Sequence, residues 1–215
     1  DGSRHVSGNR CERGASTERV PKKSELPNLY DYKYRRLFGY RRLTHEKATR
    51  GEIGIPRVLN MYENFPLWFT ILTGLGFRVT ISGRSNHEVF EQGMESIPAE
   101  NACYPAKLAH GHIEGLLDRG IRTIFYPCVP FESKEIREAD NNFNCPIVAF
   151  YPQVLERNMA HLHADGVRYL SPMLNLDDAD KLAERLVDVF ADWDVTLEEA
   201  KEAVQAGFEE DAAVK

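Results

Sequence analysis

Short, almost continuously apolar segments recur along the chain from residue 52 onward. The runs over residues 77–81 (Phe-Arg-Val-Thr-Ile) and 167–170 (Val-Arg-Tyr-Leu) are too short for helices, and glycine or polar residues bound them. Such runs, rich in β-branched and aromatic residues, are typical of strands that are buried on both faces. The pattern predicts five strands, over residues 53–59, 77–81, 123–127, 146–150 and 167–170.

The segments between these runs have the length and apolar spacing of helices. Gly76 ends the first of them, and Thr196 with Glu199 forms a capping-box pattern at the start of the last. Strands that alternate with helices indicate a Rossmann-like three-layer α/β sandwich with a mainly parallel five-stranded sheet. Helices are expected over residues 62–75, 87–97, 103–120, 153–164, 178–192 and 196–210.

Residues 1–50 lack this regularity and differ in charge. They contain 13 basic and 6 acidic side chains, whereas the whole chain has a net charge of −6. Only residues 28–38 could hold a short strand or helix. We interpret residues 1–50 as a basic arm or linker that docks on the acidic domain of residues 51–215, or on a neighbouring domain. Nucleic-acid binding is disfavoured, because the basic residues alternate with aromatic ones and no Gly/Ser-rich tail is present.

Composition narrows the class of protein further. The hydrophobic content of 42% and the charged content of 28% are those of a globular protein. No apolar stretch approaches the roughly 20 residues of a membrane helix, and the start is not a signal peptide. The four widely spaced cysteines do not indicate a disulfide framework. These features predict a soluble cytoplasmic domain, and the missing initiator methionine suggests a fragment of a larger protein.

Polar residues follow the expected strands at positions where they could form a pocket. In doubly wound sheets, ligands bind beyond the carboxyl ends of the strands. The loop after the first strand and the segment around the start of the third helix meet at this edge, and Lys107 there could hold an anion or an acidic partner, or could simply be solvated. The pocket residues expected from this argument are Asn60, Tyr62, Glu63, Glu100 and Lys107.

Two cysteines are expected at this same edge. Cys128 ends the third strand, and Cys103 begins the helix that leads into that strand. Backbone N–H groups at a helix start favour a thiolate and can donate to the sulfurs of a cluster. A metal or cluster shared by the two thiols is therefore expected, although their spacing matches no short zinc or ferredoxin motif. A buried, inert thiol is the alternative for each.

The remaining candidate ligands have different settings. Cys145 precedes the expected fourth strand, so we expect it at the amino edge, in the core and away from the other pair. Cys11 has turn residues on both sides, which suits a ligand loop or an exposed thiol in a linker. His110 and His112 are two residues apart on a helix, so a joint metal site is not expected. No nucleotide-binding loop or serine-hydrolase motif occurs.

Several segments resemble one known family. The similarity is to the DUF2229 segment of large CoA-substrate-specific enzyme activases, the activators of 2-hydroxyglutaryl-CoA dehydratase, and it runs through nearly the whole chain. The segments that carry it are residues 7–14 (SGNRCERG), 26–30 (LPNLY), 53–64 (IGIPRVLNMYEN), 103–112 (CYPAKLAHGH) and 125–128 (FYPC).

The resemblance implies a cofactor and partners. Related subunits of 2-hydroxyacyl-CoA dehydratases and benzoyl-CoA reductases bind a [4Fe–4S] cluster through three cysteines, and Cys103 and Cys128 match the first two. The third ligand of those subunits comes from a later region, whereas Cys11 belongs to a motif of the large activases and is a further candidate. The implied partners are the ATPase module of the activase and dehydratase-like subunits.

Two hypotheses of different classes follow. The leading one is an iron–sulfur domain with an electron-transfer or acceptor role beside an ATP-driven activase, without catalysis of its own. The alternative is a scaffold domain that docks partners and whose cysteines are structural or bind zinc. A small-molecule enzyme is the weakest interpretation, because no pair of general base and nucleophile can be named.

Overall fold

The sheet at the centre of the molecule is parallel throughout. The computed structural model describes residues 26–136 and 138–215, and within them four strands pair in the order β2-β1-β3-β4. The prediction of an α/β sandwich with a parallel sheet is therefore confirmed, but the sheet has four strands where five were expected. The strands are β1 (Glu52–Ile55), β2 (Arg78–Ile81), β3 (Thr123–Phe125) and β4 (Arg168–Leu170).

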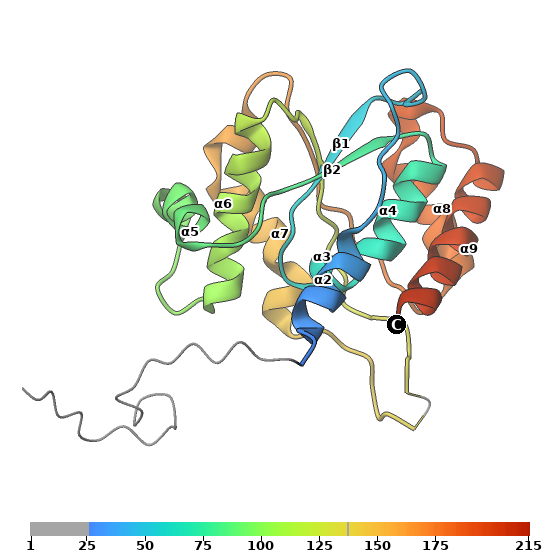
Figure 1. The fold of residues 1–215 in the computed structure, drawn as a ribbon. Helices are drawn as coiled ribbons and strands as arrows, with labels where there is room; N and C mark the ends of the chain where they lie inside the picture. Colours follow the sequence, from blue (N-terminus) through green and yellow to red (C-terminus); the bar gives the residue numbers. More distant parts are fainter. Residues whose placement is uncertain (1–25, 137) are drawn as a thin grey trace, which may run out of the picture.

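Helices cover both faces of this sheet (Figure 1). One layer holds α4 (Phe65–Gly74), α8 (Ala179–Val189) and α9 (Leu197–Val214), which pack on one another. The opposite layer holds α5 (His87–Gly93), α6 (Tyr104–Asp118) and α7 (Pro146–Asn158). The predicted capping box of the last helix is present, with Thr196 and Glu199 bonding each other's backbone N–H groups. Short 3₁₀ helices cover Met94–Ser96, Ala160–His163 and Ala191–Trp193.

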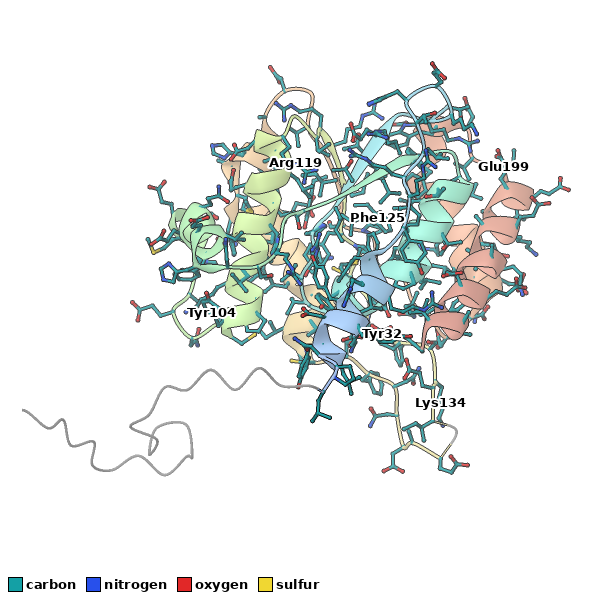
Figure 2. The ribbon with its side chains drawn as sticks, in the orientation of Figure 1. Tyr32, Tyr104, Arg119, Phe125, Lys134 and Glu199 are labelled. Carbon is teal, nitrogen blue, oxygen red and sulfur yellow. The ribbon has the colours of Figure 1, made fainter. Side chains whose placement is uncertain are left out.

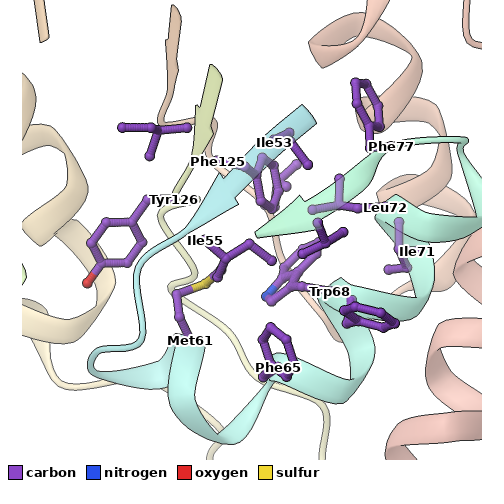
Figure 3. Packing of buried hydrophobic residues seen from close by; sticks show 14 of the residues in the cluster. Ile53, Ile55, Met61, Phe65, Trp68, Ile71, Leu72, Phe77, Phe125 and Tyr126 are labelled. Carbon is purple, nitrogen blue, oxygen red and sulfur yellow. The ribbon is translucent and has the colours of Figure 1, made fainter. Parts of the chain in front are cut away.

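Packing on both faces of the sheet explains why the strand sequences are almost continuously apolar. On one face of the sheet, Trp68 stacks edge-on against Phe125 at 5.1 Å, and Phe125 lies 5.9 Å from Phe190. Figure 3 shows this cluster between β1 and α4, with Ile53 and Ile55 reaching into it. On the other face, a Cβ at Gly54 would lie 2.8 Å from Ile121, so the glycine lets the chain after α6 approach β1 closely. Because both faces are buried, polar alternation is absent.

The expected fourth strand over residues 146–150 is wrong, because this segment begins α7. Cys145 is the N-cap, and Pro146 occupies the first turn, where its missing N–H costs no hydrogen bond. Ala149 and Leu155 are buried on one side of the helix, whereas Ile147 is exposed. A short apolar run does not by itself distinguish a strand from a helix, and Pro152, between the expected strand and the expected helix, lies inside α7.

Helix α2 (Leu29–Phe38) precedes the sheet and packs on the end of the molecule where α3 (Asn60–Glu63) lies (Figure 1). Asn28 caps it by accepting hydrogen bonds from the N–H groups of the first turn. Leu37 is buried, and Arg36 donates a hydrogen bond to the Ala213 carbonyl oxygen. Residues 26–38 thus contact the domain, while residues 1–25 of the expected arm lie outside the described residues, and the division at residue 50 stays a prediction.

Two glycines set the distance between α5 and α6. A Cβ at Gly111 would lie 1.6 Å from the carbonyl oxygen of Val89, and one at Gly93 would lie 2.2 Å from the backbone nitrogen of Gly111. The two helices therefore touch backbone to backbone. Any side chain at this crossing forces them apart.

We predict that Gly111→Ala lowers the free energy of unfolding by about 1–3 kcal/mol, because the added methyl group overpacks the helix crossing. Gly115→Ala, on the same helix, meets only the Gln92 side chain at 3.9 Å. This control should be neutral or should stabilise by about 0.5–1 kcal/mol, since alanine is the better helix former. Urea denaturation measures both variants, and equal stabilities would contradict the close contact.

Candidate functional site

The carboxyl edge of the sheet contains a topological switch point. β1 and β3 are neighbours, but the chain leaves β1 toward β2 and leaves β3 toward β4, in opposite directions. Loops that diverge in this way leave a crevice at which ligands bind in doubly wound sheets. A cavity of about 660 Å³ lies there, between the segment that follows β1 and the loop of residues 132–144 that follows β3.

The wall of this cavity contains a buried side-chain amide, that of Asn60. Asn60 is 8% exposed, and neither its Oδ1 nor its Nδ2 has a hydrogen-bond partner within the described part of the chain. The preceding Leu59 has a φ of +51°, a left-handed conformation that is strained for a leucine. Buried polar groups without partners are rare and costly, so Asn60 is suited to bond a polar group of a ligand.

A carboxylate beside Asn60 is fully engaged. Glu132 accepts hydrogen bonds from the side-chain amides of Asn64 at 2.9 Å and Asn144 at 2.6 Å. These bonds fix the loop after β3 against the loop after β1. The sequence argument missed Glu132, Asn64 and Asn144. The asparagine-rich segment 141–144 (Asn-Asn-Phe-Asn) was the available signal.

The five pocket residues expected from the sequence do not come together. Asn60 and Glu63 line the cavity. Tyr62 instead packs its ring against Phe38 of α2, with the ring centroids 4.8 Å apart. Lys107 donates a hydrogen bond to the carbonyl oxygen of Glu100, near the start of α6. Ligand binding by these residues stays a prediction.

Three cysteines lie at the carboxyl edge of the sheet. Cys103 is the N-cap of α6 and Cys145 is the N-cap of α7, and each helix runs back to start the next parallel strand. Cys128 follows β3, and its backbone forms an isolated parallel β-bridge with Met173. Figure 2 shows Tyr104, beside Cys103, on the same side of the molecule as Lys134, and Arg119 at the opposite end of α6.

The expected position of Cys145 at the amino edge is therefore wrong, because α7 replaces the predicted strand and reverses the direction of the segment. Cys145 is also exposed, as is Cys103, so it is not the core residue that we expected. Cys103 and Cys128 lie at the same edge because α6 runs antiparallel to β3, so that α6 begins where β3 ends. Cys11 lies outside the described residues.

The thiols differ in how well they suit a metal or cluster. Cys128 is fully buried, and burial raises the pKa of its thiol to about 11, although a hydrogen bond from the Gln153 backbone opposes this shift. Cys103 and Cys145 are exposed N-cap residues, where unpaired backbone N–H groups can donate to a bound ligand. The donor chemistry fits an iron–sulfur cluster. Within residues 26–136 and 138–215, however, no three Cys, His, Asp or Glu side chains are grouped closely enough to hold a metal ion.

Two buried histidines tie the surrounding loops to α6. His110 bonds the Ser96 hydroxyl through Nδ1 at 2.7 Å and the Tyr151 hydroxyl through Nε2 at 3.1 Å. His112 bonds the hydroxyls of Ser82 and Ser85 through its two ring nitrogens, at 2.8 and 2.9 Å. Burial lowers the pKa of each ring to about 4. Both rings are therefore neutral at pH 7, and each is engaged by hydroxyl groups.

Comparison with known proteins places the chain in a family. Residues 52–215 match the family described as the CoA enzyme activase uncharacterised domain (DUF2229). The chain belongs to this family. The match confirms the resemblance drawn from the sequence motifs and covers the whole α/β sandwich. No curated protein and no solved structure matches the chain. Among the helices described, none is long and apolar enough to cross a membrane.

The contrast between the thiols predicts selective reactivity in the metal-free chain. Cys103 and Cys145 should be alkylated rapidly by iodoacetamide at pH 8, because both are exposed. Cys128 should be protected until the chain unfolds, since it is buried and its thiol has a pKa near 11. Mass spectrometry of the labelled peptides, with and without urea, measures this. Equal labelling of Cys103 and Cys128 in the folded chain would count against the described edge.

The two histidines predict a loss of stability in mild acid. Between pH 6.5 and about 4 the unfolded chain binds protons on them that the folded chain does not bind, so the free energy of unfolding falls as the pH is lowered through this window. Each shift corresponds to about 3 kcal/mol as an order of magnitude. Urea denaturation of wild type and His110→Gln at pH 7 and pH 5 tests this. The difference between the two pH values should be smaller in the variant, and an unchanged difference would refute the assignment.

Proposed function

We propose that this CoA enzyme activase domain supplies cysteine ligands to a [4Fe–4S] cluster and accepts or relays electrons for a dehydratase-type enzyme. Its partners would be the ATPase module of the activase and the dehydratase-like subunits. The domain would have no catalytic activity of its own. The proposal extends the family membership, which by itself supports an activase-type role.

The observation that carries the proposal is the common edge of three thiols. Cys103 and Cys145 are the N-caps of α6 and α7, and Cys128 follows β3, which lies between these helices along the chain. Thiolates are the usual ligands of such clusters, and hydrogen bonds from backbone N–H groups to the sulfurs tune the reduction potential. A bound cluster would supply one-electron chemistry. The chain itself would hold the thiols and shield Cys128 from water.

The described residues provide part of a ligand set, since no group of three ligands is preassembled in them. Cys11 and residues of a neighbouring domain are the sources proposed for the rest. The raised pKa of the Cys128 thiol makes it protonated at neutral pH. Metal binding would have to release this proton, so cluster loading should be favoured at higher pH.

A scaffold domain that docks partners remains the second candidate, and one observation favours it. Large apolar side chains are exposed beside Cys145, on the loop after β3 and on the first turns of α7. Phe143 is 62% exposed, and Ile147 and Phe150 are also open to solvent. Exposed apolar side chains that gather beside a functional edge are typical of surfaces that bind other proteins.

Anaerobic expression with iron and sulfide analysis tests the cluster directly. We expect iron and acid-labile sulfide in the purified chain, together with a broad absorption that bleaches on reduction. Cys103→Ser and Cys128→Ser should each abolish the iron content, and Cys145→Ser should lower it, because the topology brings this thiol to the same edge.

Ser133→Ala provides a control at the same edge that removes no thiol. It should retain the wild-type iron content. A metal-free chain that nevertheless binds the dehydratase subunits, and whose binding the cysteine variants leave unchanged, would refute the cluster and favour the scaffold. Zinc in place of iron under anaerobic conditions would refute the electron-transfer role.

A further inference from the structure

A group of arginines without acidic partners lies on the β1–β2 side of the carboxyl edge, away from the cysteines. Arg57 follows β1 and Arg84 follows β2, and Arg119, from the far end of α6, donates a hydrogen bond to the Ile81 carbonyl oxygen where β2 ends. None of the three forms an ion pair with a carboxylate in the described part of the chain, and the charges of Arg84 and Arg119 act on Arg57. The chain as a whole is acidic, with a net charge of −6. A local excess of positive charge is therefore a specific feature of this region.

Arg57 is the most unusual of the three. Arg57 is only 9% exposed, and its Nε and Nη1 are buried and have no hydrogen-bond partner among residues 26–136 and 138–215. Burial lowers the pKa of Arg57 to about 10, so the guanidinium still carries its charge at pH 7. A buried charge without a counter-ion is costly, and buried arginines are normally paired. The unbonded N–H groups of Arg57 are therefore available to an anionic ligand.

The loop that carries Arg84 is held in position. Ser82 accepts a hydrogen bond from the Arg57 backbone N–H at 2.8 Å and also bonds Nδ1 of His112. Ser85 bonds the other nitrogen of the same ring. Because the neutral His112 fixes the serines on both sides of Arg84, this loop is preorganised and the two arginines are held on one side of α6.

A cavity of about 430 Å³ opens next to the arginines. It lies under α2 and is lined by Asp31, Tyr34, Arg35 and Arg84. Tyr34 contacts the side chains of both Arg57 and Arg84. Its ring centroid lies 3.8 Å from the guanidinium carbon of Arg84 and 5.2 Å from that of Arg57. The Tyr34 ring thus separates Arg57 from the cavity.

We propose that Arg57 and Arg84 bind the phosphoryl group of a ligand in this cavity, and that Tyr34 is the side chain that moves aside to admit it. Guanidinium groups bond phosphoryl oxygens in pairs, and two of them can engage a tetrahedral dianion from different directions. A phosphoryl dianion offers one more acceptor oxygen than a carboxylate and carries a charge that matches two guanidinium groups. The aromatic rings of Tyr34 and Phe38 hold the guanidinium of Arg57 when the anion is absent, through cation–π contacts.

Pyrophosphate and inorganic phosphate are the probes, with acetate as the carboxylate control, all at constant ionic strength. In the wild-type chain, pyrophosphate and phosphate should raise the midpoint of thermal unfolding saturably by several degrees, because they bind only the folded state. Arg84→Ala should raise the dissociation constant for pyrophosphate at least tenfold in calorimetric titration. Arg57→Met should abolish the saturable shift.

The Arg57→Met variant also tests whether the buried guanidinium of Arg57 serves anion binding or stability. Without phosphate it should be at least as stable as wild type, because an apolar side chain of similar length replaces an unpaired buried cation. Arg185→Ala changes an exposed arginine of α8, in the opposite helical layer, and is the control that should bind pyrophosphate like wild type. The cysteine variants should also bind normally, since this site does not depend on a cluster.

Two results would overturn the proposal. If Arg57→Met is markedly less stable than wild type and phosphate shifts all variants equally, Arg57 serves only to stack on the aromatic rings. If acetate shifts the unfolding midpoint as far as phosphate does, the assignment to a phosphoryl group is wrong.

Discussion

The pairing of β1 with β3 is the constraint on which the rest of the structure depends. The two strands lie side by side, yet the chain leaves them in opposite directions, so the loops that follow them diverge and leave a cavity between them. All strands of a parallel sheet end at the same edge, so the loops that follow them lie at one end of the molecule. The thiols, the Asn60 amide and the side chains of Arg57 and Arg84 therefore gather at one end of the sandwich, although they come from distant parts of the sequence.

The sheet holds this arrangement with few hydrogen bonds. The strands have three or four residues each, and β1 pairs with β3 through a single registered residue pair, Gly54 with Ile124. Most of the stabilisation must come from the two helical layers, which bury large side chains such as Trp68 and Phe125 against the sheet. Polar bonds then fix the loops beyond the core, with Glu132 joining the first and third loops and His112 holding the second.

Much of the fold could be predicted from the sequence because the physical signals were local. The runs over 77–81 and 167–170, the glycine after the first helix and the capping box at Thr196 each reflect one element, and each element is present. The prediction for residues 146–150 was wrong because their composition is typical of a strand. Their burial has the spacing of a helix, and this burial is known only from the structure. The candidate site was harder to predict. Asn64 and Asn144 contact Glu132 across 68 and 12 positions of the chain, and no sequence periodicity indicates such contacts.

The single error at residues 146–150 changes the chemistry of the edge. A strand there would have put Cys145 at the amino edge of the sheet, and the cysteine pair would have lacked a third thiol. Because the segment is a helix, it begins at the carboxyl edge of the sheet. Its N-cap, Cys145, therefore lies at the same edge as Cys103 and Cys128. The edge then divides into a half with thiols beyond β3 and a half with arginines beyond β1 and β2, and the cavity beside Asn60 opens between the loops after β1 and β3. A negatively charged group bound at either half would be stabilised by the helix starts or by the arginines there, so the fold concentrates its capacity for anionic ligands at this edge.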